Sequence, residues 1–232
     1  MIDFQQFEVL SFDCYGTLID WESGILTALK TILSKHNINI ADKRILELYA
    51  QTESNQQSGK YLKYREVLKE VVQGFGQELN FEPTESELNA LAESIKDWLP
   101  FPDTVEALQA LKKRYKLTII SNIDDDLFAY TDKKLQVEFD WIITAEQVKS
   151  YKPSLQNFEV AIGRIGIPTD QLLHVAQSVY HDIVPAKSMG LATVWVNRRQ
   201  GKEGSGATVS ANGNPDLEVP DLKTLISLMG LG

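Results

Sequence analysis

The sequence predicts an α/β fold, in which a parallel sheet carries helices on both faces and an inserted helical bundle lies over it. Two observations predict it. Short apolar segments alternate with amphipathic segments along most of the chain, and one long interval, 22–98, contains only helical patterns. Alternating strands and helices are typical of a parallel sheet, because the connection between two parallel strands is usually a helix. The 232 residues suffice for such a core with an insertion.

Five segments have the character of buried strands, because each is short, rich in β-branched or aromatic residues and flanked by polar or turn-forming residues. They are residues 7–13 (FEVLSFD), 116–121 (KLTIIS), 139–144 (FDWIIT), 172–177 (LLHVAQ) and 192–197 (ATVWVN). The helices predicted around them are 103–114, 154–165, 182–189 and 221–229. Asp103 and Ser154 occupy predicted N-cap positions.

The interval 22–98 breaks the alternation of strands and helices. Its amphipathic patterns, such as ILTALKTILSKH and ESELNALAESIKDWL, predict four helices. Pro100 and Pro102 mark the return to the sheet. The predicted units are a core of residues 1–20 and 99–232, a helical cap of residues 21–98 and, within the core, a Gly/Ser/Asn-rich surface loop at 198–219.

Composition and charge exclude several classes of protein. Hydrophobic residues make up 43% and charged residues 24% of the chain, which is typical of a globular protein. The net charge of −9 repels nucleic acid and anionic lipid, so we expect neither as a partner. One cysteine, no apparent signal peptide and no apolar run near the ~20 residues of a membrane span predict a cytoplasmic protein. Whether it forms a homodimer stays open.

Polar residues follow the predicted strands at the edge where ligands bind to open parallel sheets. Asp13 follows the first strand, and Gly16 allows a close turn beside it. A carboxylate there is either a nucleophile that forms a covalent ester or a turn-forming aspartate. Ser121 and Asn122 end the second strand, where they offer hydroxyl, amide and backbone N–H groups to an anion or cap a helix.

Charged residues complete the same edge. Lys152 precedes a proline, and it either neutralises Asp13 and a developing oxyanion or is a solvated surface charge. Gln177 ends the fourth strand. Asp182 stands at the next helix N-terminus, where it holds Lys152 and an attacking water or only caps the helix. The aspartates at 124–126 suit the positive end of a helix dipole better than a metal site.

In this order, the segments resemble the four motifs of the haloacid dehalogenase superfamily. FDCYGTLID is similar to the first motif, SNI to the second, YKP to the third and VAQSVYHDIVPAKSMG to the fourth, and the helical insertion resembles the superfamily's cap. The resemblance covers nearly the whole chain. It implies a Rossmann-like core and a hydrolase with Asp13 as nucleophile.

Two positions resemble the 2-haloacid dehalogenases of this superfamily more than its phosphatases. Tyr15 stands where phosphatases have an acid that protonates a leaving alkoxide, a proton that a halide does not need. Gln177 stands where they have an aspartate that helps to hold Mg²⁺. The resemblance implies an (S)-2-haloacid dehalogenase-like enzyme that acts on a small haloacid without a metal cofactor. The alternatives are a Mg²⁺-dependent phosphatase, with Asp13 and Asp182 as ligands, and a non-catalytic binding module.

Other positions differ from those dehalogenases. Ala50 stands where the subfamily has an arginine beside the halide, and Phe158 stands where it has a tyrosine. Gln177 and Val179 stand where its fourth motif has a serine and an asparagine. The candidates for a replacement cation are Lys60, Lys63 and Arg65. An altered pocket makes a smaller or harder halide conceivable, and hence defluorination.

The resemblance implies that Asp13 attacks the halogen-bearing carbon, that Lys152 stabilises the carboxylate and a later oxyanion, and that Asp182 orients a water that hydrolyses the ester. The expected substrate-binding residues are Tyr15, Thr17, Ser121, Asn122 and Gln177, with side chains from 49–65 closing over the organic part. Cys14 is expected to pack. His174 and His181 are either acid–base groups or, as we expect, a packed strand residue in the case of His174 and a supporting neighbour of Asp182 in the case of His181.

Overall fold

The computed structural model describes residues 2–232 and contains one six-stranded parallel sheet. Its strands lie in the order β3–β2–β1–β4–β5–β6. They are β1 (Val9–Phe12), β2 (Lys116–Ser121), β3 (Trp141–Thr144), β4 (Leu172–Ala176), β5 (Ala192–Val196) and β6 (Leu217–Val219). The first five confirm the predicted strands. The sixth contradicts the surface loop predicted at 198–219, because Leu217 and Val219 pair with β5 at the edge of the sheet.

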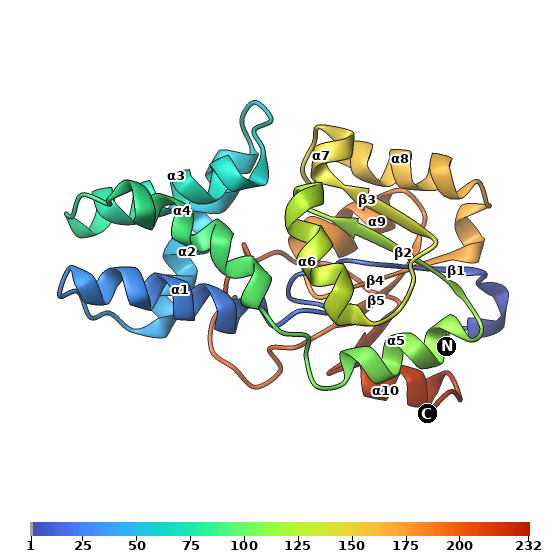
Figure 1. The fold of residues 1–232 in the computed structure, drawn as a ribbon. Coiled ribbons are helices and arrows are strands. Elements are labelled where there is room, and N and C mark those ends of the chain that lie inside the picture. Colours follow the sequence, from blue (N-terminus) through green and yellow to red (C-terminus); the bar gives the residue numbers. More distant parts are fainter. Residues whose placement is uncertain (1) are drawn as a thin grey trace.

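Helices cover both faces of the sheet (Figure 1). One face packs against α8 (Leu155–Ile165) and α9 (Val184–Ser188). The other packs against α5 (Thr104–Lys112), α6 (Asp125–Leu135) and α10 (Leu222–Leu228). Short helical turns complete the core: η1 (Phe4–Gln6), α7 (Ala145–Val148), η3 (Thr169–Gln171) and the π-helical η4 (Val179–Ile183). The alternation of side chains along β1 explains the two layers, since Val9 belongs to one buried cluster and Leu10 to the other.

The predicted helical insertion is present between β1 and β2. It consists of α1 (Trp21–Lys35), α2 (Asp42–Gln57), α3 (Tyr64–Leu79) and α4 (Glu85–Ser94), followed by the short turn η2 (Ile95–Asp97). These helices stand together at one end of the sheet (Figure 1). Within residues 2–232, no helix has both the length and the apolar character required to cross a bilayer.

Two aspartates at helix starts serve a different helix from the one expected. Asp103 precedes α5, but its carboxylate accepts a hydrogen bond from the backbone N–H of Leu222, at the start of α10. Asp124 precedes α6, but its two oxygens accept from the backbone N–H groups of Tyr64 (2.9 Å) and Arg65 (3.0 Å), at the start of α3. Asp124 therefore joins the insertion to the core beside the predicted site.

Candidate active site

Three charged side chains meet at the carboxyl end of the sheet. Asp13 directly follows β1, Lys152 lies between α7 and α8, and Asp182 lies in η4. Lys152 Nζ is 3.0 Å from Asp13 Oδ1 and 2.6 Å from Asp182 Oδ1. Lys152 is only 1% exposed. A lysine is seldom buried unless opposite charges pair with it, so these three side chains form an ion cluster in the interior of the fold and not a surface contact.

Neighbouring groups fix the orientation of the Asp13 carboxylate. Thr17 Oγ1 donates a hydrogen bond to Asp13 Oδ2 at 2.7 Å and accepts one from the backbone N–H of Gln177 at 2.8 Å. Lys152 Nζ also donates to the backbone carbonyl of Ile120 at 2.7 Å. Each Asp13 oxygen therefore has a fixed partner, and the carboxylate has one orientation.

A buried histidine extends the cluster behind Asp182. His174 Nε2 lies 3.0 Å from Asp182 Oδ1, and His174 Nδ1 lies 2.9 Å from Ser11 Oγ. Ser11 of β1 and His174 of β4 are partners in the register of the sheet. The expectation that His174 only packs is therefore incomplete, because its ring also holds Asp182 in place. The signal in the sequence is a pair of polar residues inside two buried strands.

Burial and mutual charge set the protonation of the cluster. Burial raises the pKa of Asp13 above its ordinary 3.8, although Lys152 and Thr17 oppose the change. Burial alone would raise the pKa of Asp182, but Lys152 and the His174 hydrogen bond lower it. Burial alone would lower the pKa of Lys152, but the two carboxylates raise it. Asp13 is the more basic carboxylate, which suits a nucleophile, while Asp182 stays ionised.

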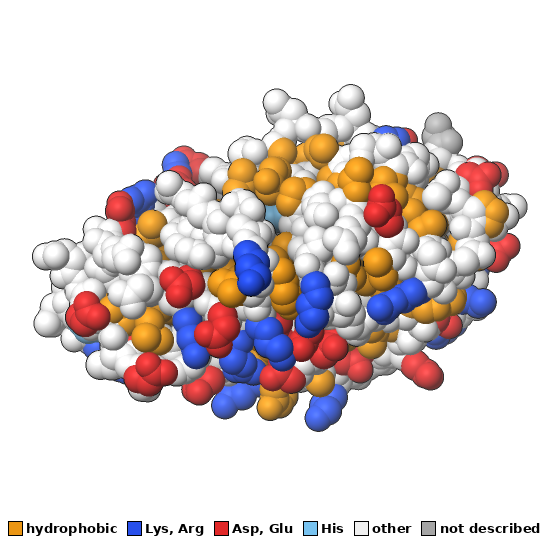
Figure 2. Space-filling view, turned by 90° about the horizontal axis from the view of Figure 1, so that it is seen from above, with side chains coloured by type: hydrophobic (Ala, Val, Ile, Leu, Met, Phe, Trp, Pro, Cys, Tyr) orange, Lys and Arg blue, Asp and Glu red, His pale blue; other side chains and the backbone are white. Residues whose placement is uncertain are grey.

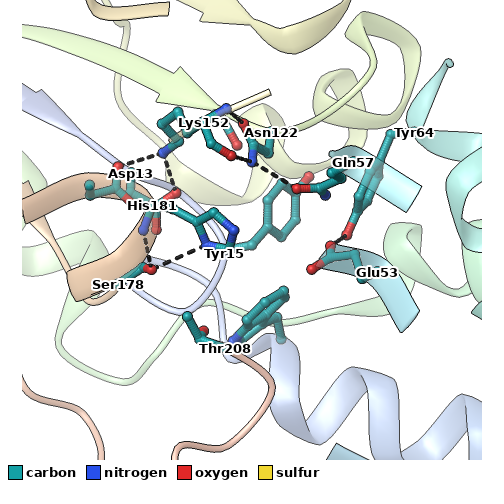
Figure 3. Close-up of a pocket in the computed structure, with 13 residues that line it drawn as sticks. Asp13, Tyr15, Glu53, Gln57, Tyr64, Asn122, Lys152, Ser178, His181 and Thr208 are labelled. Atoms are coloured by element: carbon teal, nitrogen blue, oxygen red, sulfur yellow. Dashed lines mark hydrogen bonds and ion pairs between the residues drawn. The ribbon is translucent and has the colours of Figure 1, made fainter. Parts of the chain in front are cut away.

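The cluster forms one side of a small cavity (Figure 3), in which the centre of a water-sized molecule can occupy about 30 Å³. The core contributes Asp13, Tyr15, Ser121, Asn122, Lys152, Ser178, His181 and Asp182. The insertion and the segment after β5 contribute Trp21, Glu53, Gln57, Tyr64 and Thr208. The cavity thus brings together residues from β1, β2, η4 and the insertion.

A larger cavity of about 320 Å³ adjoins the first and shares Gln57, Lys152 and His181 with it. Its walls include the rings of Tyr61 and Tyr151, which are stacked with centroids 5.4 Å apart. Viewed from above, a hollow lined by hydrophobic side chains lies between the insertion and the core (Figure 2).

Three of the predicted substrate-binding residues line the inner cavity. Ser121 Oγ is buried and has no hydrogen-bond partner among the described residues, so it is free to bind a ligand. The Asn122 side chain holds the Lys152 backbone, accepting from its N–H at 2.8 Å and donating to its carbonyl at 3.0 Å. The Tyr15 hydroxyl lies 2.9 Å from Thr131 Oγ1.

Thr17 and Gln177 lie elsewhere than expected. Neither is among the residues that line the inner cavity. The Thr17 hydroxyl already donates one hydrogen bond and accepts another, so it positions Asp13 and has no free proton for a substrate. Gln177 supports Thr17 through its backbone N–H, and its carbonyl accepts from Trp195 Nε1 at 2.8 Å.

The insertion presents a carboxyl group to the cavity. Glu53 on α2 is 3% exposed, and its Oε1 accepts from the hydroxyls of Tyr64 (2.6 Å) and Tyr49 (3.2 Å). Burial raises the pKa of Glu53 from 4.5 to about 7, although these hydrogen bonds oppose the change. The sequence interpretation missed Glu53. The signal was its position after Leu46 and Tyr49 on the buried face of an amphipathic helix, where a charged residue is unusual.

The predicted replacement cations lie away from the cavity. Lys63 Nζ pairs with Glu146 at 2.6 Å, and Arg65 pairs with Asp126 at 2.7 Å. Lys60 is exposed. None of the three is among the lining residues, so the prediction that one of them lies beside the halide is wrong. Acidic side chains of the core attract Lys63 and Arg65 to the outside of α3 instead.

The two carboxylates that the Mg²⁺ alternative requires, Asp13 and Asp182, share one ammonium group. Across residues 2–232, no three His, Cys, Asp or Glu side chains gather closely enough to hold a metal ion together. Gln177, at the place of a third acid, supports Thr17 instead. This donor set fits a lysine better than a divalent cation, which prefers several free oxygen ligands.

Comparisons with known proteins agree with the geometry. A family model described as haloacid dehalogenase-like hydrolase matches residues 7–190. Haloacetate dehalogenase H-2 of Moraxella sp. (strain B) is 25% identical over 231 residues, which are 98% of this chain and 100% of that protein. (S)-2-haloacid dehalogenase H-109 of Pseudomonas putida is 28% identical over 224 residues, 94% of this chain and 96% of that protein.

A solved structure shares the fold over almost the full length. The L-2-haloacid dehalogenase from Xanthobacter autotrophicus superposes with a TM-score of 0.78 at 21% identity, covering 97% of this chain and 98% of that one. The likeness includes both the sheet and the insertion, because it spans nearly all of each chain.

Proposed function

We propose that this chain, which belongs to the haloacid dehalogenase-like hydrolases, acts on carbon–halide bonds and removes halide from short 2-haloacids through an ester of Asp13. One observation carries the proposal: a buried, oriented aspartate paired with a buried lysine lines a small cavity. The haloacetate and (S)-2-haloacid dehalogenases among its relatives support it.

In the first step, an Asp13 oxygen attacks the halogen-bearing carbon. The C–O bond forms while the C–halogen bond breaks, and the halide leaves with the electron pair. Thr17 and Lys152 hold the carboxylate in the attacking orientation. Tyr15 is not placed to act as an acid, because its hydroxyl bonds Thr131 and burial raises its pKa well above 10. A site without an acid suits a leaving group that is a weak base.

In the second step, water hydrolyses the ester at the Asp13 carbonyl carbon. Asp182 Oδ2 is buried, lacks a partner among the described residues and can orient that water. Its other oxygen is held by Lys152 and His174. The Lys152 ammonium stabilises the oxyanion that develops on the Asp13 carboxyl group. The Asp13 carboxylate and a 2-hydroxyacid result.

The substrate carboxylate binds beside Ser121, whose hydroxyl is otherwise without a partner. Residues 21–98 act as a cap over the core of residues 1–20 and 99–232 and exclude water from the first step. The small size of the inner cavity favours short acids, and fluoroacetate is the smallest substrate that we propose. No metal takes part in either step.

Halide release tests the proposal. Fluoroacetate, chloroacetate and both enantiomers of 2-chloropropionate are incubated with the protein in the presence of a chelator. We expect release from at least one of them, and we expect Asp13→Asn to abolish it without unfolding the chain. Release only of phosphate from a phosphate ester, restored by Mg²⁺ after chelation, would replace the proposal with the phosphatase alternative.

A further inference from the structure

The side of the cavity formed by the insertion carries hydrogen-bonding groups and no Lys or Arg among the described lining residues. Glu53 lies across the cavity from Asp13 (Figure 3). The hydroxyls of Tyr49 and Tyr64 donate to Glu53 Oε1. The other carboxyl oxygen of Glu53 points toward the middle of the cavity in that view. Gln57, one helical turn further along α2, has a buried Nε2 that lies close enough to Glu53 to oppose the rise in the pKa of its carboxyl group. The amide oxygen of Gln57 faces the core, where it accepts from Asn122 Nδ2 at 3.3 Å, so the Glu53 carboxyl group is the donor that faces the nucleophile.

We propose that Glu53 receives the departing halide by donating a hydrogen bond from its protonated carboxyl group. This inference rests on the proposed function. In an in-line displacement, the halide leaves on the side of the carbon away from the Asp13 oxygen, which is the side of α2. The C–halogen bond breaks, the halide takes the electron pair, and the proton stays on Glu53 within the hydrogen bond. Glu53 thus takes the place of a cation.

The charges around the cavity favour the protonated form of Glu53. The ionisable groups that face or surround it are Tyr15, Tyr49, Tyr64, Tyr151, Asp13, Lys152, Asp182 and His181. The tyrosines stay neutral because burial raises their pKa values, and burial lowers the pKa of His181 to about 4. Two carboxylates and one ammonium leave a negative charge, and a haloacid adds another. Binding of an anion therefore keeps the proton on Glu53.

A neutral donor also favours a small halide. Fluoride has the highest charge density of the halides and accepts the strongest hydrogen bonds, so it gains most from a carboxylic acid. Burial raises the pKa of Glu53 to about 7, so the carboxyl group is about half protonated at pH 7 and mostly protonated below it. The donor is lost as the pH rises above this value.

The test uses two variants of Glu53 and a matched control. Glu53→Gln keeps an N–H donor but cannot ionise, whereas Glu53→Leu removes the donor. Glu87→Gln is the control, because Glu87 is also a buried glutamate of the insertion but bonds to Thr84 at the start of α4 and lines neither cavity. Chloride release from chloroacetate is measured for each protein between pH 5.5 and 9.

We expect kcat/KM of the wild type and of Glu87→Gln to fall about tenfold per pH unit above about pH 7. Glu53→Gln lacks this fall. At pH 6, Glu53→Leu releases chloride about 10- to 100-fold more slowly than the wild type, while its circular dichroism spectrum is unchanged. A fall above pH 7 that persists in Glu53→Gln, or wild-type chloride release by Glu53→Leu, would overturn the inference.

Bromide binding separates this inference from the proposed function, because it needs no turnover. Trp21 lines the same cavity, so the part of the tryptophan fluorescence quenching that Trp21→Phe removes reports bromide bound there. We expect bromide affinity to weaken at least tenfold from pH 6 to pH 9 in the wild type and to be independent of pH in Glu53→Gln. If no haloacid is hydrolysed but this pattern is found, only the proposed function fails. Bromide binding that does not respond to pH in the wild type overturns the halide site itself.

Discussion

Replacing Lys152 with methionine removes the cation that pairs with two buried carboxylates. The ammonium lies 3.0 Å from Asp13 and 2.6 Å from Asp182, and all three side chains are buried. Removing one partner of a buried ion pair leaves the other charge uncompensated and lowers the free energy of unfolding by about 3–5 kcal/mol. We expect a loss of this size for Lys152→Met at pH 8.

A second ion pair of similar length provides the control. Lys187 lies 2.7 Å from Asp216, but their side chains are 35% and 34% exposed. Solvent screens such a pair, so Lys187→Met is expected to lower the free energy of unfolding by about 0–1 kcal/mol. The two variants make the same chemical change and differ mainly in burial.

The decrease in the free energy of unfolding caused by Lys152→Met is larger at high pH than at low pH. Without the ammonium, burial raises the pKa values of Asp13 and Asp182 above their unfolded value of 3.8. A carboxyl group with a raised pKa stabilises the fold below its unfolded pKa and loses that contribution as the pH rises through its folded pKa. Lys152→Met is therefore less destabilised at pH 5 than at pH 8. Urea unfolding followed by tryptophan fluorescence measures both values. A loss at pH 8 no larger than that of Lys187→Met would refute this account of the cluster.

Three further predictions follow from the same geometry. Asp182→Asn should slow ester hydrolysis more than ester formation, so the ester should accumulate during turnover. Intact mass spectrometry should then find the chain heavier by the acyl group. An unmodified mass contradicts the role of Asp182. Ser121→Ala should raise KM for chloroacetate about tenfold with little change in kcat, since one hydrogen bond to the carboxylate is lost; an unchanged KM rules out that contact. The pKa of Glu53 is raised from 4.5 to about 7, so its contribution to stability is complete below pH 4.5 and lost as the pH rises through 7. Relative to Glu53→Gln, the wild type should lose about 2.5 kcal/mol of unfolding free energy between pH 5 and pH 8, and parallel pH profiles would contradict this.

The ion cluster could be predicted from the sequence because each member lies near the end of a strand or at the helical turn that follows one. Asp13 and Asp182 follow segments with a clear apolar strand pattern, and parallel strands bring their carboxyl ends to one edge. The order of the motifs then placed Lys152 beside them. Local sequence pattern and chain order were sufficient to predict the cluster, because the topology of a parallel sheet brings these segments together at one edge.

The residues on the insertion side of the cavity could not be predicted, because their positions depend on how the helices pack and not on local sequence patterns. Glu53 belongs to an amphipathic helix, and its inward orientation follows from how α2 packs against α1 and α3. Asp124 has the local pattern of an N-cap for α6, and only the position of α3 shows that it binds another helix. Lys63 and Arg65 point outward for the same reason, since the acidic residues that attract them lie far away in sequence.

The central claim, that Asp13 forms an ester with the substrate, is tested most directly by the source of the product oxygen. The protein is kept in excess over chloroacetate in H₂¹⁸O, so that each active site turns over at most once. The account predicts that the hydroxyacid carries ¹⁶O from Asp13 and that ¹⁸O enters the Asp13 carboxylate. ¹⁸O in the product of the first turnover, with an unlabelled Asp13, would show direct attack by water and contradict the account.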